Sequence, residues 1–217
     1  YCTKNDILFV GDTGTRAVCS LDTLPAALTV PHFLPLVAAA TAAAIVMTGT
    51  TDGIGEALAD FPGLPHRFET VFRDDHLAVI NDSAATTPQS VCKALIAVPY
   101  RPVVLIAGGG GHKNLDYRPL ARCIREHADL LILFAQDPAS RRLRACPEIH
   151  SFPPRETVSS MDDAVRLGLD FLNAHGGGTL LLSPGGSGAP FFPDLFHRGD
   201  CFKACIKNLM QRQPRAE

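Results

Sequence analysis

The sequence has no tryptophan, little net charge and no long apolar run. Its 20 Lys and Arg residues against 22 Asp and Glu residues leave a formal net charge of −2, whereas surfaces that bind duplex nucleic acid or anionic membranes are usually strongly basic. The most apolar run, residues 34–47, falls short of the roughly 20 residues that a membrane-spanning helix needs. We therefore expect neither nucleic acid nor a membrane as a partner, and we expect residues 34–47 to form a buried helix.

Cysteine is plentiful, but the patterns that mark a cysteine-based site are missing. Seven cysteines, an odd number, occur without a C-x-x-C pair, and the one close pair is Cys201 and Cys205. Zinc sites and disulfide frameworks normally show paired spacings. No signal peptide is visible either. We interpret the cysteines as reduced thiols and expect a cytoplasmic protein.

A phosphate-binding loop of the Walker A type is also missing from the sequence. The glycine run at residues 108–111 leads to Lys113, but His112 precedes this lysine and Asn114 follows it, where a Walker A loop has Gly and then Ser or Thr. The run does not match the G-x-G-x-x-G dinucleotide pattern with its later acidic residue. It therefore predicts either a turn that presents one lysine to an anion or a plain solvated turn.

Apolar strands and helical segments alternate over most of the chain. The segments predicted as strands are residues 77–80, 103–107, 130–134, 149–152 and 179–182, and the segments predicted as helices are residues 88–98, 119–128, 138–145, 160–173 and 200–210. Ser160 can cap its helix, with Asp163 at the third helical position. Strands that are apolar throughout, separated by helices, indicate an α/β fold with a mostly parallel sheet covered by helices on both faces.

The first 60 residues show a different pattern. Two short β-type pieces, residues 7–10 and 17–19, flank a glycine turn and predict a hairpin, which is followed by helices at residues 34–47 and 52–60. Two prolines and a glycine at residues 61–65 exclude a continuing helix. We therefore predict two domains, residues 1–66 and residues 67–217.

Polar and small residues gather where three predicted strands end. Ligands of open parallel α/β sheets bind at the carboxyl ends of strands. After the first of these strands, Asp82 can hold a metal or a nucleotide hydroxyl, or simply cap a helix, and residues 83–87 supply donors at a helix N-terminus. The stretch of small residues at 183–190 admits close approach of a ligand to the backbone, or is an ordinary glycine-rich connection.

The order and spacing of five motifs distinguish this chain from a generic α/β protein. They are G-L-P-H-R-x-E at 63–69, I-N-D-S-x-A-T-T-P at 80–88, the glycine turn with its lysine followed by residues 115–120, L-L-S-P-G at 181–185 and R-G-D-x-F at 198–202. Together, from about residue 28 to residue 210, they resemble the Mur ligase family, and within it the members that add D-glutamate.

This resemblance implies an organisation and a reaction. Residues 1–66 would be the C-terminal remnant of the family's central ATP-binding domain, and residues 67–217 its Rossmann-like C-terminal domain. The family implies ATP and Mg²⁺ as cofactors, mostly held upstream of this chain. ATP activates the carboxylate of UDP-N-acetylmuramoyl-L-alanine as an acyl phosphate, and the amine of D-glutamate attacks it, in peptidoglycan synthesis.

The resemblance also assigns roles to individual residues. His66, Arg67 and Asp82 match positions at the nucleotide, whereas Thr86 and Lys113 match positions at the D-glutamate end of the ligand. Ser187 and Gly188 lie where the family has a serine at that end, and this serine aligns with Gly188. No catalytic residue and no metal ligand is assigned within this chain.

Three further positions depart from the family pattern. Ala84 stands where a lysine is frequent, Leu195 stands where an aromatic residue is usual, and residues 32–36 lack both asparagines of the H-N-x-x-N element. They leave the adenine-side contacts and the D-glutamate pocket less defined than the other motifs.

Two alternatives remain open at this point. One is a related ligase that adds another amino acid, or adds glutamate to a folate. The other is a Rossmann-like fragment without catalysis that binds a nucleotide or an acidic amino acid, and a phosphate loop upstream of Tyr1 would separate these classes. For the ligase we expect a monomer, and we expect this chain alone to be inactive.

Overall fold

The computed structural model describes residues 2–11, 14–111, 115–150, 152, 155–188 and 191–212. The chain divides into two compact units, Tyr1–Leu64 and Pro65–Glu217. The division falls two residues before the boundary that the sequence predicts. Each unit is described by itself.

The first unit is a hairpin with helices. Strand β1 (Asp6–Gly11) pairs with β2 (Gly14–Ser20) in antiparallel fashion, which confirms the predicted hairpin. The helices of this unit are η1 (Leu21–Thr23), α1 (Ala26–Thr29), α2 (Leu34–Thr48) and α3 (Ile54–Ala59). Its small core gathers Ile7, Leu24, Leu28 and Val37.

Helix α2 is where the sequence predicts it, but the expectation that it is buried is wrong for most of its surface. Only Val37, Thr41 and Ile45 are buried, and their four-residue spacing places them on one stripe. By contrast, Val46 and Met47 are 80% and 86% exposed. The helix is apolar all round, and a unit built on two strands covers only one side of it. None of the helices within the described ranges is long and apolar enough to cross a membrane.

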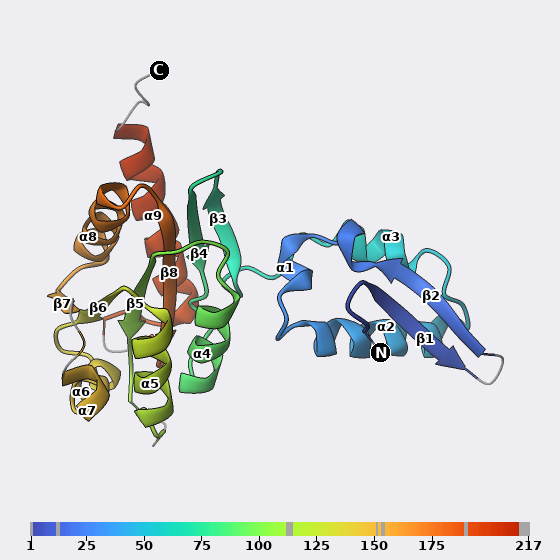
Figure 1. The fold of residues 1–217 in the computed structure, drawn as a ribbon, viewed down its shortest axis with the longest axis horizontal. Coiled ribbons are helices and arrows are strands. Elements are labelled where there is room, and N and C mark those ends of the chain that lie inside the picture. The colour runs from blue at the N-terminus through green and yellow to red at the C-terminus, as the bar shows by residue number, and fades with distance from the viewer. Residues whose placement is uncertain are drawn as a thin grey trace. The chain divides into compact units, whose positions relative to one another are not determined.

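The second unit is built on a six-stranded sheet in the order β3-β4-β8-β5-β6-β7 (Figure 1). Its strands are β3 (Glu69–Arg73), β4 (Leu77–Asn81), β5 (Val103–Gly108), β6 (Leu130–Phe134), β7 (Arg155–Val158) and β8 (Gly178–Gly185). All neighbours pair in parallel except β3, which pairs antiparallel with β4 at the edge. The predicted α/β fold with a mostly parallel sheet is confirmed.

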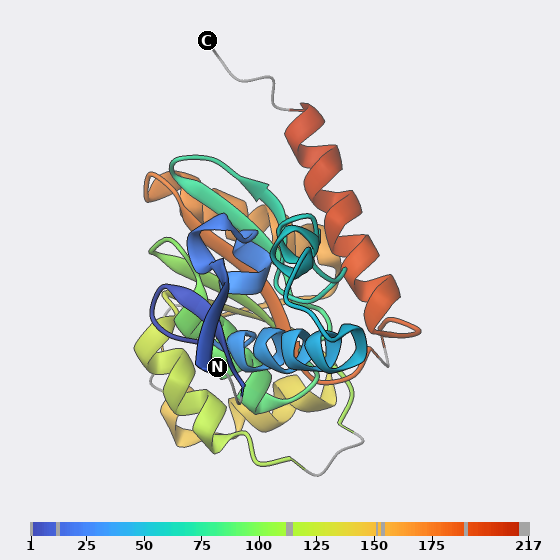
Figure 2. The same cartoon turned by 90° about the vertical axis from the view of Figure 1, so that its right-hand side faces the viewer.

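Helices cover both faces of this sheet (Figures 1 and 2). They are α4 (Pro88–Ala97), α5 (Arg118–His127), α6 (Pro138–Arg144), α7 (Pro147–His150), α8 (Met161–Ala174) and α9 (Leu195–Arg212), the red helix of Figure 2. Residues such as Val79, Val104 and Leu180 point to the face where α8 and α9 pack. Because side chains alternate along a strand, their neighbours Ile80 and Leu181 face α4 and α5. The central strands are therefore apolar throughout.

The sequence predicted the start of α8 correctly, but it misled at residues 149–152. Ser160 accepts a hydrogen bond from the backbone N–H of Asp163 at 3.0 Å, as the capping pattern predicts. The predicted strand at residues 149–152 is wrong, because Pro147–His150 forms the short helix α7 and the strand begins at Arg155. Ile149 is the one fully buried residue of α7. Its apolar side chain was taken as the sign of a strand, but it enters the core from a helical turn. The antiparallel edge strand β3 was not predicted.

Strand β8 enters the sheet through glycines that tolerate no side chain. Gly177 and Gly178 have φ values of +127° and +132°. An added Cβ at Gly178 would run into the carbonyl oxygen of Pro102 and lie 2.7 Å from a methyl of Leu172. Gly176, with φ +77°, has open space around the same position. Neighbouring atoms therefore leave no room for a side chain at Gly178, whereas at Gly176 only the backbone conformation disfavours one.

We predict that Gly178→Ala lowers the free energy of unfolding of the 65–217 unit by about 3 kcal/mol or more, because both strain and a backbone clash oppose the methyl group. Gly176→Ala, which meets only the strain, should lower it by about 1 kcal/mol. Urea unfolding monitored by circular dichroism gives both values. Equal losses in the two variants would contradict the close packing of Gly178 against Pro102 and Leu172.

Candidate functional site

The carboxyl ends of three adjacent strands meet at one edge of the sheet. In the order β4-β8-β5, Asn81 pairs with Leu182 and Gly108 pairs with Gly185, so the three strands end at similar heights. The segments that follow them are residues 82–87, 186–188 and 109–111. We call Asp82, Ser83, Ser183, Ser187 and Arg198 the strand-end cluster.

Within the strand-end cluster, Asp82 is buried and bonded to other parts of the same unit. Its side chain is buried, and its two carboxylate oxygens accept hydrogen bonds from the backbone N–H of Phe68 at 3.1 Å and from the Ser183 hydroxyl at 2.8 Å. Burial raises the pKa of Asp82 to about 7, against the opposing effects of Ser183, Phe68 and Arg67. The carboxyl group therefore joins β4, β8 and the turn at residues 66–69.

Arg198 is the central cation of the cluster, and its side chain is 1% exposed. Its guanidinium donates to the hydroxyl of Ser83 at 3.0 Å, to the carbonyl of Ser83 at 2.8 Å and to the carbonyl of Ser187 at 2.7 Å. Burial lowers the pKa of Arg198 to about 10, and the charge of Asp137 opposes this shift. This structural role of the arginine could not be predicted from the R-G-D-x-F motif alone.

The turn that carries Arg67 has an unusual backbone. His66 and Phe68, on either side of it, have positive φ values of +63° and +49°. Glu69 accepts hydrogen bonds at 2.9 Å from the His66 backbone and from Asn81, whose amide also lies 3.0 Å from His66 Nδ1. These contacts hold an exposed Arg67 in a strained turn, and such strain concentrates at functional sites.

A second feature of this turn explains the glycine of the R-G-D-x-F motif. Any Cβ on Gly199 would collide with the imidazole of His66 and lie 3.0 Å from the amide nitrogen of Asn81. His66 itself is buried. Two of the motifs quoted from the sequence, around residues 66 and 199, therefore touch each other in the fold.

Ser187 and Gly188 occupy the turn after β8. The Ser187 carbonyl accepts from Arg198 and from the backbone N–H of Gly110 at 2.9 Å, whereas its hydroxyl is buried without a partner among the described residues. A Cβ on Gly188 would collide with the backbone of Asp194. A serine side chain therefore does not fit at position 188 on this backbone, and Ser187 supplies the hydroxyl of this turn.

Two further predicted residues lie on the turns beside this one. Thr86 is partly buried and directly precedes Thr87, the N-cap residue of α4, whose hydroxyl accepts from the Ser90 backbone at 3.3 Å. Lys113 falls outside the described residues. The glycine turn leading to it is placed, since Gly110 is bonded to Ser187. The structure thus brings Thr86, Ser187 and the glycine turn at residues 108–111 to one sheet edge.

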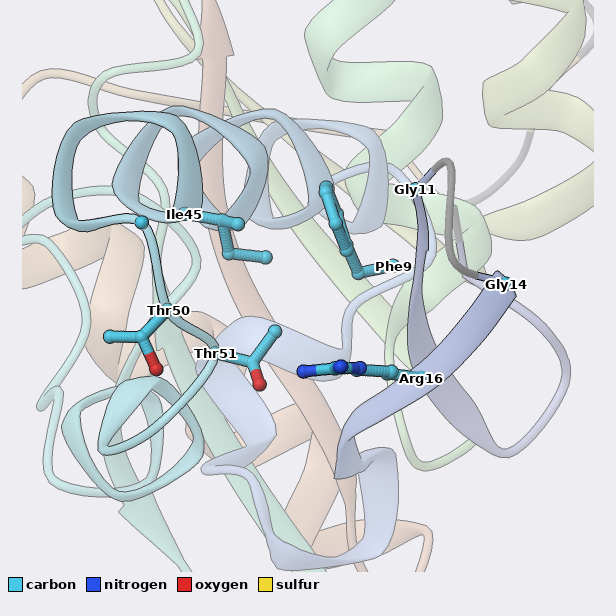
Figure 3. Close-up of a pocket in the computed structure, with 8 residues that line it drawn as sticks. Phe9, Gly11, Gly14, Arg16, Ile45, Thr50 and Thr51 are labelled. Carbon is cyan, nitrogen blue, oxygen red and sulfur yellow. The ribbon is translucent and has the colours of Figure 1, made fainter.

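Among the residues that the structure describes, no group of three or more His, Cys, Asp or Glu side chains is placed to hold a metal ion, so we assign no Mg²⁺ ligand. In the first unit, a cavity of about 260 Å³ is lined by Phe9, Gly11, Gly14, Arg16, Ile45, Gly49, Thr50 and Thr51. Figure 3 shows Arg16 extending from β2 towards Thr51. No sequence motif marked this cavity, and no predicted site residue lines it.

The buried carboxyl groups predict how stability depends on pH. Burial raises the pKa of Asp82 to about 7 and that of Asp137 to about 6, so the folded state binds more protons than the unfolded chain above pH 4. Stability from these groups is full below the unfolded pKa and is lost as pH rises through the folded pKa. We predict that the free energy of unfolding falls from pH 4 to pH 7, by at most about 1.4 kcal/mol per pH unit for each group.

Variants separate the two contributions. Asp82→Asn should flatten the profile between pH 6 and 7, where the proton on Asp82 dominates. Asp137→Asn, the matched control, should flatten it only below pH 6. Urea unfolding at half-unit pH steps measures this, and an unchanged slope between pH 6 and 7 in Asp82→Asn would overturn the assignment.

Several curated proteins with similar sequences share one name. A protein of Desulfosudis oleivorans named UDP-N-acetylmuramoylalanine–D-glutamate ligase is 35% identical over 208 residues, which are 93% of this chain and 44% of that protein. A protein of the same name from Roseiflexus sp. is 33% identical over 90% of this chain and 41% of its own length. The chain therefore spans less than half the length of these relatives.

Solved structures show the same fold at low sequence identity. Folylpolyglutamate synthase of Mycobacterium tuberculosis, solved with ADP and AMPPCP, matches with a TM-score of 0.62 at 17% identity, over 96% of this chain and 48% of that one. MurF ligase of Thermotoga maritima, solved with ADP, matches with a TM-score of 0.61 at 14% identity, over 98% and 46% of the two chains. These two likenesses concern the fold alone.

The family is shown by a match to the sequence itself. The family model described as "Mur ligase, glutamate ligase domain" matches residues 66–186. This range is more than half of the chain, and it includes the turn of Arg67, Asp82 and the glycine turn before Lys113. The chain therefore belongs to the Mur ligase family, through its glutamate ligase domain.

Proposed function

We propose that this chain is the C-terminal portion of a cytoplasmic, monomeric, ATP-dependent ligase that adds D-glutamate to UDP-N-acetylmuramoyl-L-alanine in peptidoglycan synthesis. The observation that carries the proposal is that the strand ends preceding Thr86, Lys113 and Ser187 in the sequence meet at one sheet edge. The shared name of the curated relatives supports the choice of D-glutamate.

In this proposal the sheet edge binds the amino acid that is added. Thr86, Lys113 and Ser187 supply a hydroxyl, an ammonium and a second hydroxyl, which suit the carboxylates of D-glutamate. Gly188 lets the backbone come close, because it carries no side chain. The positive charge of Arg198 beneath these turns favours a ligand with two carboxylates at the edge.

The turn at residues 66–69 is the proposed nucleotide side. Arg67 is exposed and offers a guanidinium to phosphate oxygens. His66 and Asp82 act by holding this turn, because both oxygens of Asp82 are already engaged inside the unit. ATP would activate the muramoyl substrate as an acyl phosphate, and Mg²⁺ would be held by residues that this chain does not supply.

A ligase that adds glutamate to a folate is the second candidate. The likeness to folylpolyglutamate synthase, at a TM-score of 0.62, is as good as that to MurF ligase, so the fold does not distinguish the two. The sequence relatives that share the name of a muramoyl ligase, two of them at 35% and 37% identity, favour the muramoyl substrate. An assay of the complete enzyme with each acceptor would decide between them.

In the complete enzyme, we predict that Lys113→Ala raises the KM for D-glutamate roughly ten- to hundredfold. The lost charge-assisted hydrogen bond to a carboxylate is worth about 1.5–3 kcal/mol. The KM for ATP should change much less. Steady-state kinetics with each substrate varied in turn measures the difference.

Lys93→Ala is the matched control, because Lys93 is exposed on α4 and belongs to no proposed site. It should leave both KM values as they are. An unchanged KM for D-glutamate together with an unchanged kcat in Lys113→Ala would refute the assignment, and the pocket would then have to be sought around Thr86 and Ser187.

We further predict that the 217-residue chain alone hydrolyses no ATP and forms no amide, because no Walker A motif occurs in it. Phosphate release by the purified chain, with and without D-glutamate and the UDP-muramoyl substrate, tests this. Steady release that depends on both substrates would show that the chain holds its own nucleotide site.

A further inference from the structure

Two cysteines far apart in the sequence meet between α4 and α5. Cys92 lies in the middle of α4 and Cys123 in the middle of α5, and these two helices pack against each other. The Cys123 thiol donates to the backbone carbonyl of Cys92 at 3.8 Å, and it lies close enough to the Cys92 side chain for the two thiols to affect each other's pKa. The separation of 31 residues in the sequence gave no sign of this pair.

The two thiols differ in the way that a reactive pair requires. The hydrogen bond from Cys123 lowers the pKa of Cys92, which is partly exposed. The pKa of Cys123 is raised by its interaction with Cys92 and by burial. By contrast, burial raises the pKa of Cys146 and of Cys205. Thiolate character and exposure decide which cysteine reacts, so Cys92 is suited to attack and Cys123 to resolve.

We propose that Cys92 and Cys123 form a dithiol site that peroxides oxidise to a disulfide linking α4 to α5. The Cys92 thiolate attacks one peroxide oxygen, so the O–O bond breaks, the leaving oxygen takes a proton, and Cys92 becomes a sulfenic acid. The Cys123 sulfur then attacks the Cys92 sulfur, and the displaced hydroxide leaves as water with the Cys123 proton. Each hydrogen peroxide thus accepts two electrons and yields two waters and one S–S bond.

The placement of this pair gives the disulfide a structural effect. The bond would close a loop that contains β5, the glycine turn and Lys113, all of which lie between residues 92 and 123 in the sequence. Helix α4 also begins two residues after Thr86. The disulfide would therefore fix the spacing of the helices that follow two ligand-facing turns. The chemistry of the pair itself does not depend on the proposed function.

The test is oxidation of the purified chain by hydrogen peroxide, followed by alkylation of the remaining thiols in denaturant and mass spectrometry. We expect the loss of two alkylation sites and of two hydrogen atoms, with a linked pair of peptides containing Cys92 and Cys123. Dithiothreitol should restore both sites. Before oxidation, Cys92 should be alkylated at least about tenfold faster than Cys146 in the folded protein.

Matched variants make the result decisive. Cys146→Ser removes a buried thiol that instead donates to the carbonyl of Arg142, and it should leave the linked peptide unchanged. Cys92→Ser should abolish the link, and Cys123→Ser should leave Cys92 as a sulfenic acid that dimedone traps. Phenylarsine oxide, which bridges close thiol pairs, should protect Cys92 and Cys123 together in the unoxidised chain. If Cys92 and Cys123 stay unlinked while other thiols oxidise, or if Cys92 links to another cysteine, the proposal is wrong.

Discussion

A single buried guanidinium, that of Arg198, fixes the geometry of the strand ends. It donates to two oxygens of Ser83 and one of Ser187, so one side chain from α9 joins the ends of β4 and β8. These acceptors are uncharged, so oriented carbonyl and hydroxyl dipoles stabilise the buried cation. Removing one of these acceptors would leave a buried charged donor without its hydrogen bond, which is costly. The turns after β4 and β8 are therefore held at fixed positions without a ligand.

The same hydrogen bonds separate structural groups from groups that can bind a ligand. Both oxygens of Asp82 and all three nitrogens of Arg198 are engaged inside the unit. The hydroxyl of Ser187 has no partner among the described residues, and Arg67 is exposed. A ligand at this edge would meet Ser187 and Arg67, while Asp82 and Arg198 hold the turns that carry them. This division could not be read from the motifs, which contain residues of both kinds.

Local signals predicted most of the elements, and tertiary contacts decided the rest. The strands of the parallel core were recognisable because burial on both faces makes them apolar throughout. The helix α8 was recognisable from its cap at Ser160. Residues 149–152 misled because one buried isoleucine and its neighbours suit a strand as well as a helical turn. The edge strand β3 was missed because only two of its five residues, Val71 and Phe72, pack on the apolar core. The exposed sides of α2 were missed because a helix that is apolar all round gives no sign of which face is covered.

The candidate site shows why residue roles follow the backbone and not only the order of motifs. The family's serine aligns with Gly188, yet the backbone of Asp194 leaves no room for a side chain there. The neighbouring Ser187 carries the hydroxyl, and its carbonyl is fixed by both Arg198 and Gly110. Ser187, one residue before the aligned position, therefore lies in a turn that is held by the R-G-D-x-F motif and by the glycine turn. In a turn this constrained, backbone hydrogen bonds and close contacts decide which residue can offer its side chain to a ligand. Here they favour Ser187 over position 188, although the sequence alignment places the family's serine one residue later.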